Sequence, residues 1–231
     1  MGFSAVSLNT RLLTRGGFFF LGWLVACAAP AAPVMEFVPP AAGTYRLDRI
    51  QPATQGAVLD ADGRRRRLSE FTHGRVTLLA FMYSSCADPN GCPYALTVMH
   101  LAKNQLEKLP QARGRVRFVS LSFDPVRDTP QVIALYGRDH SGAAQNVAWD
   151  FLTTRSRREL LPILNGFGQD VGVDIDRATG RPVGTYSHVL KLFLIDRHGA
   201  VREIYTTDYL LPAMVLNDIK TLLMEDGVRL K

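Results

Sequence analysis

The chain is poor in cysteine, in net charge and in long apolar segments. Its 231 residues include only three cysteines, Cys27, Cys86 and Cys92, which leaves a single pair if one of them is used elsewhere. The apolar stretch at residues 17–26 is too short for a comfortable membrane span. The formal net charge of +6 falls to +4 if Arg11 and Arg15 leave with a leader. Such a mildly basic chain gives no indication of a nucleic-acid partner.

Internal repeats and low-complexity segments are also missing, and a chain of this length with 47% hydrophobic residues can bury one core without needing a second domain. No proline lies between Gly56 and Cys86. The Pro-x-x-x-Thr-x-x-Cys pattern of peroxiredoxins therefore does not precede Cys86, which argues against a thiol peroxidase.

The N-terminal 26 residues have the organisation of an export signal, because Arg11 and Arg15 precede the apolar stretch. The segment Leu24-Val25-Ala26-Cys27 resembles the bacterial lipobox, in which the cysteine is lipidated and becomes the first mature residue. The resemblance implies that Cys27 is a lipid attachment residue and that the protein faces the periplasm or another extracytoplasmic space. An uncleaved anchor helix extended through residues 28–32, with an incidental cysteine, is the alternative.

A tether is predicted next, at residues 27–45. Residues 28–40 are rich in Ala and Pro and include one charged residue, Glu36, so regular packed structure is not expected there. The folded domain is predicted to cover residues 46–231.

The domain alternates strand-like and helix-like segments, which predicts an α/β fold. Strands are expected at residues 76–83, 116–123, 147–152, 189–195 and 201–205. Helices are expected at residues 93–109, 130–138, 157–167 and 212–224. This order fits a thioredoxin-like fold, with a central mixed sheet flanked by helices and a C-terminal β-hairpin and helix.

Local signals support several of these boundaries. Thr129 before Pro130 is a good helix start, and Ser156 with Glu159 forms a capping box, although Pro162 predicts a later start or a bend in that helix. Residues 196–199 predict a hairpin turn. The turn-like residues 60–63 place the basic run at residues 64–67 on the exposed rim of another hairpin.

Cys86 and Cys92 occupy the junction between a predicted strand and the following helix, where side chains are exposed and functional sites of such folds are often located. Cys92 precedes Pro93, and the helix dipole there predicts that one or both thiols ionise more readily than a free cysteine of pKa about 8.5. The turn at residues 87–91 can bring the sulfurs together. Far downstream, His188 opens another strand-like run. Thiolates and an imidazole favour copper or zinc, whereas the cysteines alone could also exchange electrons or form a static disulfide.

The neighbourhood of these residues resembles the Sco/SenC family over residues 56–223. The matching segments are residues 78–86, Cys92-Pro93, residues 119–130, Tyr186-Ser187-His188 and residues 193–196 with Gly199. The stretch Asp124-Pro125-Val126-Arg127-Asp128-Thr129-Pro130 is the most specific of them.

The resemblance implies a membrane-anchored, thioredoxin-like copper chaperone that helps to metallate the binuclear copper site of a respiratory oxidase. The implied copper ligands are Cys86, Cys92 and His188, and the implied partner is a copper-accepting oxidase subunit or another cuproprotein. Two features depart from the family pattern. Five residues rather than three separate the cysteines, and Ser187 replaces an aspartate that could orient the imidazole.

Two other functions remain open. Cys86 and Cys92 could be the redox-active pair of a thiol:disulfide oxidoreductase, which would not need His188. A non-catalytic surface lipoprotein with a structural disulfide is the second alternative.

Other residues near the predicted site have simpler interpretations. Asp88 could add an oxygen ligand, but a turn-forming role is favoured. Asp124, Arg127 and Asp128 could support the cysteine loop, although capping the next helix is the simpler interpretation. The remaining histidines, at positions 73, 100, 140 and 198, are not expected to be ligands.

Overall fold

The computed structural model describes residues 37–141 and 146–230. The predicted signal, the lipid attachment at Cys27 and residues 27–36 of the tether lie outside this part of the chain. Residues Val38–Lys231 form one compact unit. Among the described residues, no helix combines the length and the apolar character needed to span a bilayer.

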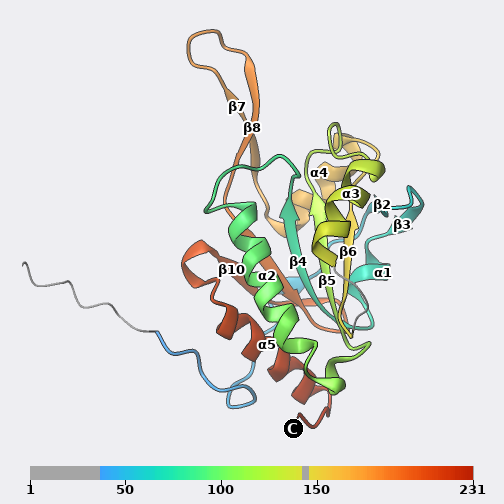
Figure 1. The fold of residues 1–231 in the computed structure, drawn as a ribbon, viewed down its shortest axis with the longest axis vertical. Helices are drawn as coiled ribbons and strands as arrows, with labels where there is room; N and C mark the ends of the chain where they lie inside the picture. The colour runs from blue at the N-terminus through green and yellow to red at the C-terminus, as the bar shows by residue number, and fades with distance from the viewer. Residues whose placement is uncertain (1–36, 142–145, 231) are drawn as a thin grey trace, which may run out of the picture. The chain divides into compact units, whose positions relative to one another are not determined.

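A six-stranded mixed sheet forms the centre of the unit, in the order β1-β10-β9-β4-β5-β6 (Figure 1). Strands β4, β5 and β6 are parallel, whereas β9 runs antiparallel to β4, β10 to β9 and β1 to β10. The strands are β1 Gln51–Pro52, β4 Val76–Met82, β5 Val116–Ser122, β6 Ala148–Leu152, β9 Lys191–Ile195 and β10 Ala200–Thr206. The mixed sheet and the terminal β9–β10 hairpin followed by a helix confirm the predicted fold class.

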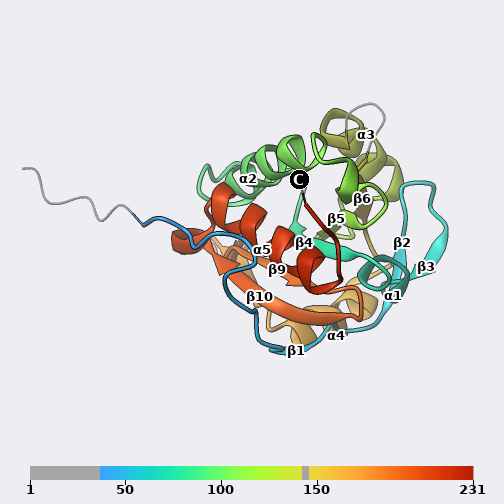
Figure 2. The ribbon, with the colours of Figure 1, turned by 90° about the horizontal axis from the view of Figure 1, so that it is seen from below.

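Helices cover both faces of this sheet (Figure 2). Helices α2, α3 and α5 pack on one face, and α1 and α4 pack on the other. The helices are α1 Ser69–Thr72, α2 Cys92–Leu106, α3 Pro130–Ser141, α4 Arg157–Phe167 and α5 Pro212–Glu225, with short 3-10 turns η1 Pro110–Ala112 and η2 Thr207–Tyr209. Because both faces are covered, all seven residues of β4 are buried, which explains its continuous apolar sequence.

Local sequence signals mark the starts of two helices, α3 and α4, as predicted. The Ser156 side chain accepts a hydrogen bond from the backbone N–H of Glu159 at the start of α4. The helix begins at Arg157 and includes Pro162, so the predicted later start is wrong. At the start of α3, the Thr129 side chain accepts from the N–H of Val132 at 3.4 Å.

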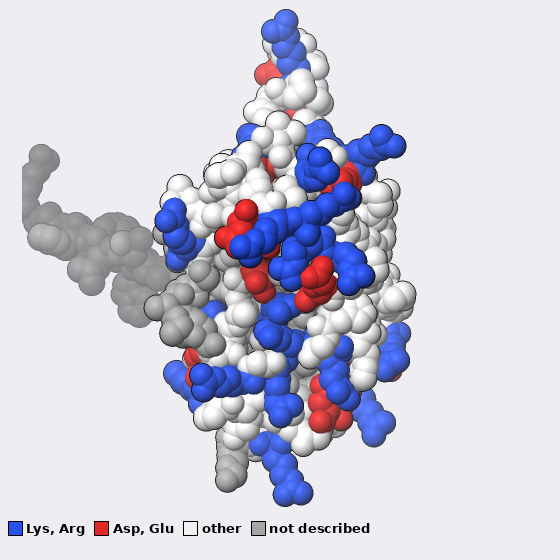
Figure 3. All heavy atoms as spheres, turned by 90° about the vertical axis from the view of Figure 1, so that its right-hand side faces the viewer, with Lys and Arg blue, Asp and Glu red and all other residues white. Residues whose placement is uncertain are grey.

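The basic run lies in a separate hairpin made by β2 Ala57–Leu59 and β3 Arg65–Arg67. Asp60 shapes its turn by accepting hydrogen bonds from the N–H groups of Asp62 and Arg64. Carboxylates lie among the arginines on this side of the molecule (Figure 3). The ion pairs join arginines 64–67 to Asp60, Asp62, Glu70 and Glu159. The local positive charge is therefore largely compensated.

A third sheet, the antiparallel pair of β7 Val171–Ile175 and β8 Pro182–His188, projects from the end of the molecule where β4 ends (Figure 1). These two strands form their own sheet and pair with no other described strand. His188 closes β8, and β9 begins only at Lys191, so the prediction that His188 opens the next strand is wrong. The apolar run that suggested it belongs to β9 alone.

The segment that leads into β1 is fastened to α5, away from the β4–α2 loop (Figure 1). The backbone N–H of Gly43 donates to the Thr221 side chain at 2.9 Å, and the Asn217 side chain donates to the carbonyl of Pro40 at 2.8 Å. Tyr45 donates its hydroxyl to Asp218. Buried Asp218 also accepts from Tyr205 at 2.7 Å, so one carboxylate joins this segment, β10 and α5.

Candidate functional site

The two cysteines lie in and just after the loop that connects β4 to α2. Cys86 is partly exposed within the loop, whereas Cys92 is the first residue of α2 and only 1% exposed. Both are free thiols. The Asp88 side chain accepts from the N–H of Asn90 at 3.0 Å, and its carbonyl accepts from Gly91, so Asp88 has the predicted turn-forming role. Gly91 lies close against the Cys86 sulfur, because a Cβ there would be 3.4 Å from Sγ.

Asp128 holds the beginning of the cysteine loop in place. Its buried carboxylate accepts hydrogen bonds from the backbone N–H of Ser84 at 2.9 Å and from the Ser84 hydroxyl. The same carboxylate accepts from the Ser122 hydroxyl at 2.5 Å, at the end of β5. Asp128 therefore supports the loop, and the simpler interpretation of it as a helix cap is wrong; Thr129 has that role.

The structure changes the expectation for the thiol of Cys92. Burial raises the pKa of Cys92 well above its ordinary value, and the hydrogen bond and negative charge of the neighbouring Cys86 raise it further. Backbone groups of Tyr83 and Cys92 oppose this shift without overcoming it. The prediction of a readily ionised thiol is wrong for Cys92, because the thiolate loses more hydration in the core than the helix N-terminus returns.

His188 is half-buried beside the loop, and both of its ring nitrogens are buried without a hydrogen-bond partner. The ring packs against Phe123 at a centroid distance of 4.9 Å and against Tyr83 at 6.3 Å. Burial lowers the pKa of His188, while the Tyr186 backbone and the negative charges of Asp88 and Asp174 act in the opposite direction. A neutral imidazole, which has one nitrogen lone pair free to bind, is what a metal ligand requires.

Cys86 and His188 line one cavity of about 520 Å³. It lies between the cysteine loop and the base of the β7–β8 hairpin, and Tyr83, Tyr186, Asp88 and Asp174 also contribute to its wall. Cys92 does not line it; this residue lies in the apolar cluster below, with Cys86 packed against that cluster. Among the described residues, no three His, Cys, Asp or Glu side chains form a preassembled metal-binding group.

The three predicted donors therefore share a neighbourhood without being set in coordinating positions. Cys92 is held in the core, and His188 belongs to a hairpin that is not part of the central sheet. The chemistry of the donors still fits a soft metal, because two free thiols that interact with each other lie beside an imidazole whose nitrogens have no hydrogen-bond partner, and one of the thiols shares a cavity with that ring.

The other four histidines do not line the cavity that Cys86 and His188 share. The His100 and His140 rings lie together on α2 and α3, with ring nitrogens 3.0 Å apart, next to Trp149. His73 contacts the Thr72 hydroxyl at 3.3 Å, and His198 is exposed in the β9–β10 turn.

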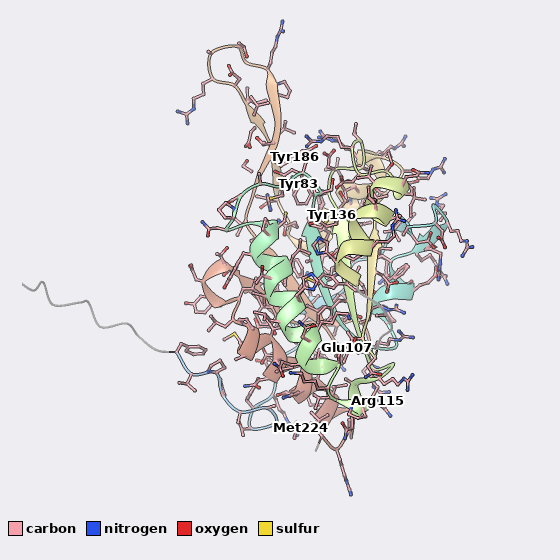
Figure 4. The ribbon with its side chains drawn as sticks, viewed as in Figure 1. Tyr83, Glu107, Arg115, Tyr136, Tyr186 and Met224 are labelled. Atoms are coloured by element: carbon pink, nitrogen blue, oxygen red, sulfur yellow. The ribbon has the colours of Figure 1, made fainter. Side chains whose placement is uncertain are left out.

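Two aromatic residues at the site were not anticipated from sequence. Tyr83 and Tyr186 meet edge to face at a centroid distance of 5.2 Å, at the base of the β7–β8 hairpin (Figure 4). Burial, together with the charge and hydrogen bond of Cys86, raises the pKa of Tyr83 to about 12. The spacing of Tyr186 two residues before His188 is a usable signal, because residues i and i+2 of a strand point to the same face.

The fold and the loop together define a thioredoxin-like protein with a paired-thiol site at a strand-to-helix junction. The SCO1/SenC family profile matches residues 54–224, and the chain belongs to this family. No curated protein sequence matches the chain.

Solved structures agree with this assignment. Sco1 from Thermus thermophilus, solved in solution in its apo form, is 26% identical, with a TM-score of 0.60 over 78% of this chain and 95% of that one. Arabidopsis thaliana ScoI, solved with copper bound, is 17% identical, with a TM-score of 0.60 over 75% and 98% of the two chains. BsSco is 23% identical, with a TM-score of 0.57 over 77% and 97%; it is a Sco-family cytochrome c oxidase assembly protein in which a disulfide switch was identified.

Proposed function

We propose that this protein is a copper metallochaperone that holds its cargo with Cys86, Cys92 and His188. The observation that carries the proposal is the pair of buried, unpartnered nitrogens of His188 in a cavity shared with the free thiol of Cys86. Buried polar atoms are nearly always hydrogen-bonded, so two bare nitrogens on one ring require an explanation. A soft metal ion bound by this ring and the two sulfurs accounts for one of the two nitrogens.

Each of the three residues has a distinct part in such a site. Burial keeps His188 neutral, so its ring offers a lone pair at neutral pH. Cys92 retains its proton until the metal displaces it, because burial raises its pKa. Cys86 is the more accessible sulfur, so an incoming cysteine or histidine of a partner would replace it first. Stepwise replacement lets the cargo pass to the partner without release into solution.

The proposed partner is a copper-accepting subunit of a respiratory oxidase or another cuproprotein. Membership of the SCO1/SenC family supports this, as do the copper-bound structure of a plant relative and the oxidase-assembly role of BsSco. Attachment through a lipid on Cys27, after an export signal at residues 1–26, would hold the domain at the outer side of the membrane through a tether that begins at residue 27. Because residues 40–45 are hydrogen-bonded to α5, the tether would end before them, and residues 38–231 would form the copper-carrying domain.

Anaerobic reconstitution of the reduced protein with Cu(I) tests the proposal. We expect one copper per chain, with binding weakened by roughly 10- to 100-fold or more in the His188→Ala variant. His100→Ala is the matched control, because this histidine lies in a separate cluster on α2 and α3. Weak binding that is equal in all three proteins would refute the chaperone function.

A thiol:disulfide oxidoreductase is the second candidate. Mutual hydrogen bonding and charge between the cysteines influence the pKa of Cys92, so the sulfurs are near neighbours, and BsSco contains a disulfide switch. A reversible Cys86–Cys92 disulfide that reduces or oxidises a partner's thiols, with no loss of rate in His188→Ala, would favour this function. Inertness in both the copper and the disulfide assays would leave the non-catalytic lipoprotein.

A further inference from the structure

The β7–β8 hairpin needs an anchor, because its backbone pairs with no other described strand. His188 is its last residue and lies beside the cysteine loop. Without a fixed base, the hairpin would let the imidazole swing away from the two sulfurs. The side chains at the base therefore determine where His188 lies.

Tyr186 provides the anchor by lying between two arginines from different parts of the fold. Arg157 at the start of α4 donates a hydrogen bond from Nη2 to the Tyr186 hydroxyl oxygen at 2.6 Å, and its guanidinium lies 5.5 Å from the ring centroid. The Arg127 guanidinium lies 5.4 Å from the same centroid. Arg127 is itself ion-paired to the buried carboxylate of Asp124 in the loop between β5 and α3.

The backbone of β8 leaves room for this arrangement. Gly184 has a φ of +82°, and a Cβ there would lie 3.4 Å from Nη1 of Arg127. A larger residue at position 184 would be strained and would press on the guanidinium. Arg127 also lies 5.8 Å above the ring of Tyr83, so one arginine joins the hairpin to the end of β4.

The side chains of Tyr186 and His188 share the same neighbouring residues. They are separated by one residue on β8 and point to the same face of the strand. Phe123 contacts both rings, at centroid distances of 5.6 Å for Tyr186 and 4.9 Å for His188. Tyr83 also packs against both rings, and Figure 4 shows it beside Tyr186. A change in how Tyr186 is held would therefore move the imidazole as well.

We infer that Tyr186 is a positioning residue, clamped by Arg127 and Arg157, which holds His188 at the cysteine loop for metal binding. The inference rests on the proposed copper-binding function and adds three residues that act through His188 without touching the metal. The clamp draws together β8, the β5–α3 loop and α4, so the imidazole is held by elements far apart in the sequence. Its position is thereby set before any metal arrives.

The first test needs no copper. Hydrogen–deuterium exchange of the reduced apo protein should be faster over residues 171–188 in Arg157→Gln than in the wild type. Arg158→Gln is the matched control, because Arg158 is exposed on the same turn of α4. Equal exchange in the hairpin of all three proteins would overturn the clamp, whatever the copper assays show.

The second test is a double-mutant cycle on Cu(I) affinity, measured by competition with a chromophoric chelator. We expect Tyr186→Leu and Arg157→Gln to weaken binding by about tenfold, and Tyr186→Phe, which keeps the ring, to weaken it less. In the His188→Ala background the same substitutions should have no further effect, because the clamp acts only through the imidazole.

The outcomes separate the two ideas. Wild-type protein that does not bind copper, or binds it independently of His188, refutes the proposed function. Copper binding that depends on His188 but is unchanged by Arg157→Gln and Tyr186→Leu refutes the clamp alone. Equal losses with and without His188 would also refute it, because they would show a general structural effect. Circular dichroism of each variant establishes that the fold is retained.

Discussion

At the scale of single residues, a few buried polar groups organise the site more than the thiols themselves do. Asp128 illustrates this, since its carboxylate joins Ser84, near the start of the cysteine loop, to the end of β5 through three hydrogen bonds. Buried acceptors of this kind are costly to leave unsatisfied or to replace.

Replacing Asp128 by Asn is expected to lower the free energy of unfolding by about 1–3 kcal/mol, because one amide oxygen cannot accept all three hydrogen bonds. It should also accelerate amide exchange at Ser84 and Cys86. Urea unfolding and exchange measurements on the reduced protein check both effects. Asp88→Asn is the control, because this exposed residue makes a turn that Asn also supports. Equal stability of the two variants would contradict the prediction.

The His100–His140 pair leads to a prediction about pH. Burial, followed by the positive charges of His140 and Lys103, lowers the pKa of His100. As the pH falls, His100 in the unfolded chain takes up a proton near its ordinary pKa of 6.5, whereas His100 in the folded protein does so only at a lower pH. The free energy of unfolding therefore decreases as the pH falls through this region.

In His100→Gln, this loss of stability between about pH 7.5 and pH 5.5 should be smaller than in the wild type. Urea unfolding at several pH values measures the slope. His198→Gln, in the exposed β9–β10 turn, serves for comparison. A slope unchanged in His100→Gln would show that His100 does not contribute.

At the scale of the elements, the five longer strands of the central sheet and the four longer helices were predictable, whereas the short β1 and α1 and the β7–β8 hairpin were not. Helices bury β4 and β9, so their continuous apolar sequences identify them as strands. The start of α4 is marked by its N-cap residue, Ser156. In contrast, β8 is exposed along most of its length and contains a glycine at positive φ, so no burial pattern marks it. The alternation of Val171, Val173 and Ile175 before a turn was the available signal.

The tip of this hairpin should be dispensable for stability. Replacing residues 176–181 with Asn-Gly would join Ile175 and Pro182, which already face each other, through a two-residue turn. We expect the free energy of unfolding to change by no more than about 0.5 kcal/mol, since the removed residues are exposed apart from Asp176, which is partly exposed and makes its hydrogen bonds within the tip. Chemical denaturation would detect a larger loss, which would mean that the tip contributes to the core.

At the scale of the whole molecule, the site depends on segments that only the complete fold brings together. The sequence placed Cys86, Cys92 and His188 in one neighbourhood through a family resemblance, but it did not reveal that Cys92 would be buried. Nor did it reveal the contacts of Tyr186 with Arg127 and Arg157, which are far apart in the chain. Burial and long-range contacts belong to the tertiary structure, so local spacing could not supply them.

Copper should stabilise the molecule as a whole if it binds only the folded state. At a free Cu(I) concentration of 100 times the dissociation constant, the expected gain in unfolding free energy is about 2.7 kcal/mol. Thermal unfolding in a Cu(I)-buffered anaerobic solution measures it. At the same free copper concentration, His188→Ala should gain much less. Identical shifts in the two proteins would indicate that copper binds elsewhere.

The attachment of residues 40–45 to α5 has a mechanical consequence. Tyr45, Gly43 and Pro40 make their hydrogen bonds to this helix, away from the loop that contains Cys86. If the N-terminal end were held at a surface, a pulling force would enter the domain through α5 and the buried carboxylate of Asp218. The loop that contains Cys86 would not carry that force directly. The thiols would therefore stay accessible to a docking protein while the N-terminal end is under tension.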